Sequence, residues 1–273
     1  MEERREVTQQ STGILADTLS DYHVVFVGFS DFLTWLRGFK DNIETLRSDL
    51  HVERISQVSS RFFGSYDSNS ELLDSEFRRV YLEGGRRPLI IIGNPQSGPF
   101  SLYALLGHSS LLNEGIVAKL ILLTPAFGSP LADLAESCSS TGIPLCEFIT
   151  SFFGNQVAKF ETARTRVLFE KAISALDPHD RNFLDESLYY VRGSSAPIRV
   201  TPFLALPYSI LHPDGETDGI SYTRNQKLSA IGNDLGVVPA DHWDLFASMP
   251  AANSLPSYRK AFTRALLREV FER

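Results

Sequence analysis

The feature that most constrains this sequence is an alternation between short apolar runs rich in β-branched residues and longer stretches with helical spacing. The runs predict strands at 23–27, 51–55, 88–92, 118–123, 199–205 and 235–238. Between them, apolar residues return every three or four positions, as in Leu33, Leu36, Phe39 and Ile43, or Leu72, Leu73, Phe77 and Val80. Such alternation is typical of a parallel sheet with helices on both faces. We therefore predict an α/β fold.

One stretch breaks this alternation. Residues 135–193 contain no predicted strand and have the pattern of two or three helices, around 148–176 and 180–191. We predict that this stretch is a helical cap inserted into the core. The expected organisation is then a helical extension at 1–21, an α/β core formed by 22–134 and 194–273, and the cap at 135–193.

Composition excludes several classes of protein. The 273 residues are 43% hydrophobic with a net charge of -7, and the basic residues are scattered, so we expect no nucleic-acid partner. The apolar runs are far shorter than the ~20 residues that a membrane span needs, and no apolar segment follows the charged N-terminus. These observations predict a cytoplasmic protein without a transmembrane segment.

The two cysteines give little support for a bound metal. Cys138 and Cys146 lie in a polar stretch with no His or Asp at metal-ligand spacing, so a zinc site is not expected. Whether the two cysteines form a disulfide is left open. We expect no cofactor.

A strand, a tight turn and a helix follow one another near residue 90. The run Leu89-Ile90-Ile91-Ile92 leads into Gly93-Asn94-Pro95-Gln96-Ser97-Gly98 and then into the helical Phe100-Ser101-Leu102-Tyr103. This segment resembles the nucleophile elbow of α/β-hydrolases, and in particular that of bacterial triacylglycerol lipases, Gly-His-Ser-x-Gly-Gly before a helix with Ser-x-Tyr. Aligned without gaps, the glycines and the helix residues match, and Pro95 takes the place of the nucleophilic serine.

The resemblance continues on both sides of the elbow. The segment Thr124–Asp133 is similar to the lipases' Gly-Thr-Pro-His-x-Gly-Ser stretch, and Val24–Val27 followed by Leu36–Lys40 is similar to the elements around their oxyanion loop. Where that loop has His-Gly, this sequence has Gly28-Phe29. The resemblance implies an α/β-hydrolase fold and puts Gly28, Phe29 and Gln96 at oxyanion or pocket positions.

Two polar residues near the C-terminus match the lipases' triad acid and base. Asp218 lies in Glu216-Thr217-Asp218-Gly219, similar to the family's Asn-Asp-Gly, and His242 lies in Asp241-His242-Trp243-Asp244. The loops that carry them can meet at the carboxyl edge of a parallel sheet. We therefore predict that the two side chains lie within hydrogen-bond distance. The alternatives are a simple Asp-Gly turn for Asp218 and a surface histidine among carboxylates for His242.

The nucleophile is where the sequence departs from the family. A proline has no hydroxyl, and its φ near −65° conflicts with the positive φ that an elbow nucleophile adopts. Ser97 is the alternative nucleophile, two positions later, although a serine there also suits the first turn of a helix. We predict that Pro95 leaves the site without its nucleophile.

The sequence therefore favours a lipase-like α/β-hydrolase-fold protein that is catalytically impaired or non-catalytic and acts as a ligand-binding or interaction module. The expected partner is a small acyl ester, another apolar ligand or a protein. The alternative hypothesis is an active serine ester hydrolase that uses Ser97 with His242 and Asp218.

Overall fold

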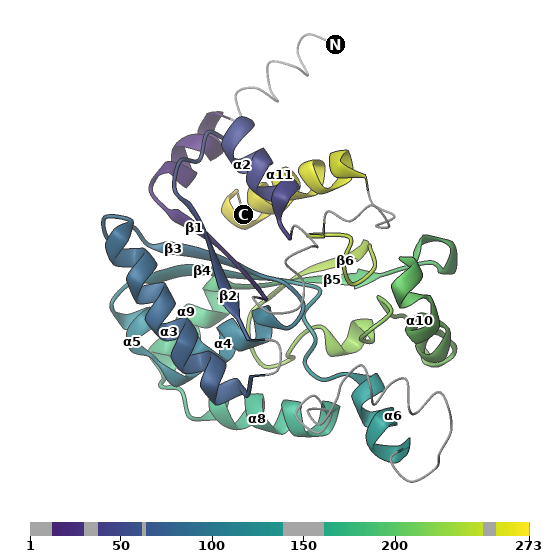
Figure 1. The fold of residues 1–273 in the computed structure, drawn as a ribbon. Coiled ribbons are helices and arrows are strands. Elements are labelled where there is room, and N and C mark those ends of the chain that lie inside the picture. Colours follow the sequence, from purple (N-terminus) through teal and green to yellow (C-terminus); the bar gives the residue numbers. More distant parts are fainter. Residues whose placement is uncertain (1–12, 30–37, 62–63, 139–160, 248–254, 273) are drawn as a thin grey trace.

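The computed structural model describes residues 13–29, 38–61, 64–138, 161–247 and 255–272. Six parallel strands form one sheet in the order β2-β1-β3-β4-β5-β6 (Figure 1). The strands are β1 (His23–Phe29), β2 (Ile55–Ser60), β3 (Leu89–Gly93), β4 (Val117–Leu123), β5 (Leu188–Ser194) and β6 (Asn233–Pro239). This sheet confirms the predicted α/β class.

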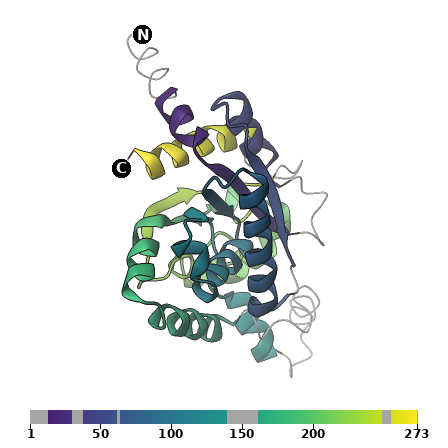
Figure 2. The ribbon, with the colours of Figure 1, turned by 90° about the vertical axis from the view of Figure 1, so that its left-hand side faces the viewer.

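Each face of the sheet has its own hydrophobic core, because side chains alternate along a strand. On β1, Val24 and Phe26 pack into one core, and Val25 and Val27 into the other. The first core is covered by the helical residues 13–20, α2 (Lys40–Ser48) and α11 (Pro256–Phe271). The second is covered by α3 (Tyr66–Glu83), α4 (Ser97–Gly107), α5 (Ser110–Asn113), α8 (Thr162–Ser174) and α9 (Pro178–Ser187). Figures 1 and 2 show these two groups of helices on opposite sides of the sheet.

The remaining described elements are short. They are α6 (Pro130–Cys138), η3 (Pro197–Arg199), η4 (Pro202–Leu204), α10 (Ala205–Leu211), η5 (His212–Asp214) and η6 (Thr223–Asn225). Among the helices in the described ranges, none combines the length and the apolar character that a membrane span requires.

Four of the six predicted strands are confirmed, those at 23–27, 88–92, 118–123 and 235–238. The prediction at 51–55 is wrong in position, because His51 has a left-handed φ of 52° and the strand begins only at Ile55. The prediction at 199–205 is wrong. Two short 3₁₀ helices form there, each opened by a proline (Pro197 and Pro202) that cannot donate to a strand ladder.

The stretch predicted to be a cap contains a strand that the sequence analysis missed. β5 pairs with β4 and β6 inside the sheet, so the predicted helix at 180–191 ends at Ser187. Ahead of it, α8 contacts α4 and α6, and α9 contacts β4 and β6. Residues 139–160 lie outside the described residues, and the existence of a separate cap remains a prediction. In the predicted extension, residues 13–20 are helical and Leu15 and Leu19 are buried in the core.

Candidate functional site

The residues predicted to form the site lie at, or after, the carboxyl ends of four strands. Gly28 and Phe29 end β1, the turn 94–96 follows β3, Asp218 lies in the connection after β5, and His242 follows β6. In open α/β sheets this edge is where ligands bind, because loops from neighbouring parallel strands come together there. The fold therefore places these loops at one edge of the sheet.

Asp218 and His242 form a buried pair. The Nδ1 atom of His242 lies 2.7 Å from Oδ2 of Asp218, and the His242 backbone N–H donates to the Asp218 carbonyl over 3.0 Å. The other carboxylate oxygen of Asp218 accepts from the backbone N–H groups of Ile220 and Ser221 at 3.0 and 2.8 Å. An ionised carboxylate only accepts hydrogen bonds, so Nδ1 is the donor, and Nε2 of a neutral ring is left as the base. The distance agrees with the sequence prediction, and a catalytic role for the pair remains a prediction.

A second carboxylate, Asp241, fixes the loop that carries His242. Its side chain accepts from the backbone N–H groups of Thr201, Trp243 and Asp244 at 2.7, 2.9 and 3.0 Å. Burial raises the pKa of Asp241, while the hydrogen bonds from Thr201 and Trp243 act in the opposite direction. The chain turn around His242 is therefore held by an internal carboxylate, which the sequence analysis described only as a flanking charge.

Two residues of the same connection as Asp218, Gln226 and Thr223, hold Gly193 near the end of β5, and the sequence analysis missed both. The Thr223 hydroxyl donates to the Gly193 carbonyl at 3.2 Å. The Gln226 side-chain amide forms two hydrogen bonds with the backbone of Gly193 in β5. Its Oε1 accepts from the Gly193 N–H at 2.6 Å, and its Nε2 donates to the Gly193 carbonyl at 3.1 Å. Gly193 has no space for a side chain, because a Cβ there would lie 2.7 Å from Cγ2 of Thr124. Thr124 itself has a left-handed φ of 45°, unusual for a β-branched residue.

The turn after β3 brings the strand and the following helix as close together as a nucleophile elbow does, but it lacks the positive-φ residue of such an elbow. A Cβ on Gly93 would lie 2.5 Å from the Gly98 Cα, so strand and helix cross at a distance that only glycine permits. Pro95 is buried, and its carbonyl accepts from the Ala126 N–H over 2.8 Å. No residue from 93 to 98, all of them described, has a positive φ.

Ser97 lies inside this turn as a structural residue. It is fully buried, and its hydroxyl lies 2.5 Å from the Val27 carbonyl and 2.7 Å from Oδ1 of Asn94. The same oxygen accepts from the Asn94 N–H at 3.2 Å. Within the described residues, the structure gives Ser97 Oγ no hydrogen bond to His242. The use of Ser97 as a nucleophile stays an alternative hypothesis.

The predicted oxyanion residues are distributed over two strand ends. The Gly28 carbonyl accepts from the Ser60 hydroxyl at 3.1 Å, which ties β1 to β2, and Phe29 is the last residue of β1. Gln96 is the half-buried N-cap of α4 and makes no side-chain capping bond. A backbone N–H at a helix N-terminus is the kind of donor that stabilises an oxyanion.

The described residues contain one cluster that has metal-ligand geometry, away from these loops. Ligand atoms of Asp177, His179 and Asp180 lie within 4.8 Å of one another at the start of α9. The Asp177 carboxylate already accepts from the Asp180 N–H at 2.9 Å, and the positive end of the helix dipole disfavours a cation. Cys146 lies outside the described residues, so the question of a disulfide with Cys138 stays open.

The fold is similar to those of several solved hydrolases. The metagenomic carboxyl esterase MGS0156 has a TM-score of 0.66 at 17% identity, over 93% of this chain and 76% of that chain. The mature Bacillus licheniformis lipase BlEst2 has a TM-score of 0.67 at 19% identity, over 91% of this chain and 92% of that chain. The phospholipase PlaB of Legionella pneumophila has a TM-score of 0.56 at 16% identity, over 76% of this chain and 44% of that chain.

No family model and no curated protein matches the sequence. The six-stranded parallel sheet and the similarity to the esterase and the lipase establish an α/β-hydrolase fold. Identities this low define the fold, and a fold supports many functions. What the protein does must therefore be argued from the loops at the carboxyl edge.

Proposed function

We propose that this protein is a lipase-like α/β-hydrolase-fold protein without a working nucleophile, and that it acts as a ligand-binding or interaction module. The proposal rests on Pro95, which lies in the turn between β3 and α4 and which the ungapped alignment with the lipase elbow puts at the nucleophile position. A proline side chain can neither attack a carbonyl nor donate a proton. The ligand class follows from the similar proteins, an esterase and lipases, and is a small acyl ester or another apolar molecule.

The environment of Ser97 supports the same proposal. A nucleophile needs a base within about 2.6–3.2 Å of its hydroxyl and a free path to the substrate. The Ser97 hydroxyl is buried and bonded to Val27 and Asn94. To act as a nucleophile it would have to leave these partners and change the start of α4.

The test is labelling with a fluorophosphonate probe together with hydrolysis of a short-chain p-nitrophenyl ester. We expect no labelled serine and at most a weak background rate. Loss of a triad nucleophile costs about 10⁶-fold in kcat, and the oxyanion hole and substrate binding together retain about 10³–10⁴ over water. Probe labelling of Ser97, or fast turnover that Ser97→Ala abolishes, would support the active ester hydrolase instead.

A Pro95→Ser variant extends the test. An elbow serine depends on positive-φ strain and on oxyanion donors as well as on its hydroxyl. Because no residue of this turn has a positive φ, we expect Pro95→Ser to gain little turnover. A large gain would show that the proline alone silences an otherwise complete site.

A further inference from the structure

The Asp218–His242 pair is held at several points. The Asp218 carboxylate is fully buried and accepts three hydrogen bonds, which come from the His242 ring and from the N–H groups of Ile220 and Ser221. The two main chains are also joined, since the His242 N–H donates to the Asp218 carbonyl at 3.0 Å. The carboxylate therefore fixes both the orientation of the ring and the position of its proton on Nδ1.

The other ring nitrogen of His242, Nε2, is left without a partner. Within the described residues no group forms a hydrogen bond with it. The ring is not sealed from solvent, because 8% of the His242 side chain remains exposed. A neutral ring with its proton on Nδ1 has a lone pair on Nε2, and the buried carboxylate would stabilise a proton taken up there. The pair therefore has the arrangement of a general base.

The segment after β4 connects this pair to the turn that carries Pro95. The Thr124 hydroxyl donates to the His242 carbonyl at 3.4 Å. Two residues later, the Ala126 N–H donates to the Pro95 carbonyl at 2.8 Å. At the start of α4 in that turn, the Gln96 N–H has no hydrogen-bond partner within the described residues. A free N–H at a helix N-terminus stabilises negative charge on a carbonyl oxygen, so a base and an oxyanion donor belong to one packed edge of the sheet.

A base of this kind can act on water when no serine is present. We propose that Asp218–His242 activates a water molecule directly against an acyl ester with an acidic leaving group, such as an aryl ester. The inference rests on the proposed lack of a working nucleophile. It gives the same site a one-step hydrolysis in place of the two-step route through a covalent acyl-enzyme.

The atoms and charges of this reaction balance with water as the only co-reactant. As the water oxygen bonds to the acyl carbon, one water proton passes to Nε2 and the carbonyl electron pair moves onto its oxygen. When the carbonyl re-forms, the bond to the leaving oxygen breaks with its electron pair, and that oxygen takes the proton from Nε2. The products are a carboxylic acid and an alcohol, and the ring is neutral again. Acid–base catalysis contributes about 10²–10⁴-fold, so the reaction requires a leaving group that is easily expelled.

The first experiment measures hydrolysis of p-nitrophenyl acetate by the wild type and two variants. His242→Gln removes the base, and we expect kcat/KM to fall about 10²-fold. Asp218→Asn is expected to lower it at least about tenfold, because an amide Nδ2 donates to Nδ1 and forces the ring proton onto Nε2. The asparagine keeps an oxygen for the N–H groups of Ile220 and Ser221, so the loop retains those bonds. Melting temperatures check that both variants are folded.

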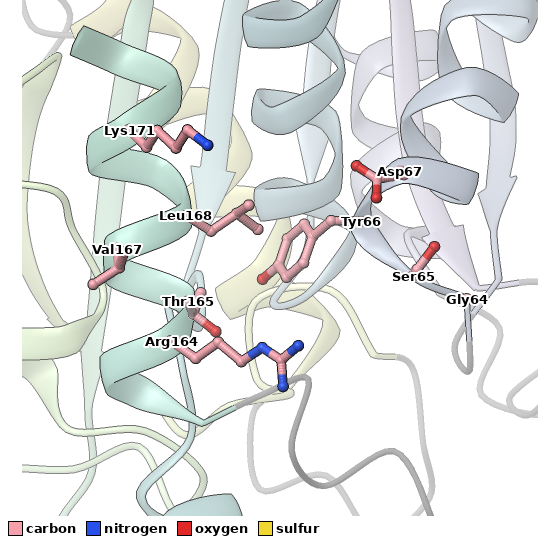
Figure 3. A pocket seen from close by; sticks show the side chains of 9 residues that line it. All are labelled: Gly64, Ser65, Tyr66, Asp67, Arg164, Thr165, Val167, Leu168 and Lys171. Atoms are coloured by element: carbon pink, nitrogen blue, oxygen red, sulfur yellow. The ribbon is translucent and has the colours of Figure 1, made fainter.

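Two exposed side chains that can also react with aryl esters serve as controls. Lys171 lines a cavity of about 370 Å³ between α3 and α8 (Figure 3), and His179 lies at the start of α9 with 80% of its side chain exposed. Lys171→Gln and His179→Gln are expected to leave the rate unchanged. A rate that falls in these controls and not in His242→Gln would come from surface chemistry and would overturn the inference.

The second experiment uses the wild type alone. In a one-step reaction p-nitrophenolate is released without a burst, and no acetyl group stays on the protein in mass spectrometry. The rate is expected to be lower in heavy water, because a proton moves as the water attacks. Ethyl acetate, which has a poorer leaving group, is expected to give no measurable turnover. An acetyl group on His242 would show attack by the ring itself and would refute its role as a base for water.

The outcomes separate this inference from the proposed function. An unchanged rate in both His242→Gln and Asp218→Asn, with no burst and no labelled serine, refutes the general base and leaves the proposed lack of a nucleophile standing. A burst with an acetylated serine overturns the proposed function, and this inference with it.

Discussion

The two halves of the candidate site differ in what each has in common with a hydrolase. After β5 and β6, Asp218 and His242 have the hydrogen bond of an acid and a base, with the carboxylate satisfied by two further N–H groups. After β3, the turn has close glycine packing between Gly93 and Gly98, and the sequence resemblance predicts that Pro95 takes the place of a nucleophile there. The comparison teaches that the packing of this turn depends on Gly93 and Gly98, whereas the proposed loss of the nucleophile concerns a different residue, Pro95.

The largest effect is expected where that packing is tightest. Gly93→Ala would place a Cβ 2.5 Å from the Gly98 Cα, and backbone atoms cannot move aside easily. We expect a loss of about 3 kcal/mol in the free energy of unfolding, at the upper end of overpacking effects, measured by urea denaturation. Gly107→Ala, at the other end of α4 with its nearest contact at 3.4 Å, is the control and should change stability little. Equal effects of the two variants would mean that the close crossing does not constrain this turn.

Ser97→Ala tests whether the serine of this turn is structural. Its hydroxyl satisfies the Val27 carbonyl and the Asn94 N–H, so its removal should cost about 1–3 kcal/mol of stability. Ser101→Ala is the matched control, because the hydrogen bond of the Ser101 hydroxyl within the described residues goes to the Ser97 carbonyl, one turn earlier in the same helix. A Ser97 variant as stable as wild type would contradict the structural role and strengthen the case for a nucleophile.

On the other half of the site, Asp218→Ala removes one carboxylate that accepts three hydrogen bonds. The His242 ring and two backbone N–H groups would lose their acceptor in a buried loop, and we expect a loss of about 1–2 kcal/mol, measured by thermal denaturation. The exposed Asp214, four residues earlier, provides the control Asp214→Ala. If Asp218→Ala had no more effect than the control, the buried pair would not contribute to stability.

The sequence predicted most of the fold because strand residues buried on both faces form strong apolar runs. It missed β5 because α9 passes into the strand at Ser187 without a loop, and Leu184, Leu188 and Val191 continue the helical spacing. It placed a strand at 199–205 because the β-branched Val200 and Thr201 outweighed the prolines on either side. Both errors arise where local spacing is ambiguous and long-range pairing decides the structure.

The candidate site was predictable only where the side chains follow a known motif. Asp218 and His242 were found in this way, and their contact was expected. The support from Gln226 and Thr223 was not, because both residues act through backbone groups of Gly193, a long-range contact with no sequence pattern. The burial of Ser97 likewise depends on the Val27 carbonyl of another strand.

The smallest effect on stability is expected from the ion pairs of Asp234, which lies in β6 and contacts Arg192 of β5. Asp234 contacts Arg192 at 2.8 Å and Lys227 at 2.8 Å, and its carboxylate accepts from the Gly236 N–H at 3.0 Å. Burial acts to raise the pKa of Asp234, but the hydrogen bonds from Lys227 and Arg192 outweigh it, so the pKa is lowered in the folded protein. A lowered carboxyl pKa stabilises the fold above the unfolded pKa of about 3.9, and this contribution is lost as the pH falls through the folded value.

Asp234→Asn should therefore cost about 0.5–1 kcal/mol at pH 7, since the partners are partly exposed, and the difference from wild type should shrink as the pH falls below about 4. Urea denaturation at a series of pH values measures this difference directly. Asp17→Asn, at an exposed position of the helix at 13–20, is the control and should give no such pH dependence. A difference that stays constant down to pH 2 would assign the effect to packing or hydrogen bonding of the neutral side chain, because a charge contribution must disappear once the carboxylate is protonated in both states.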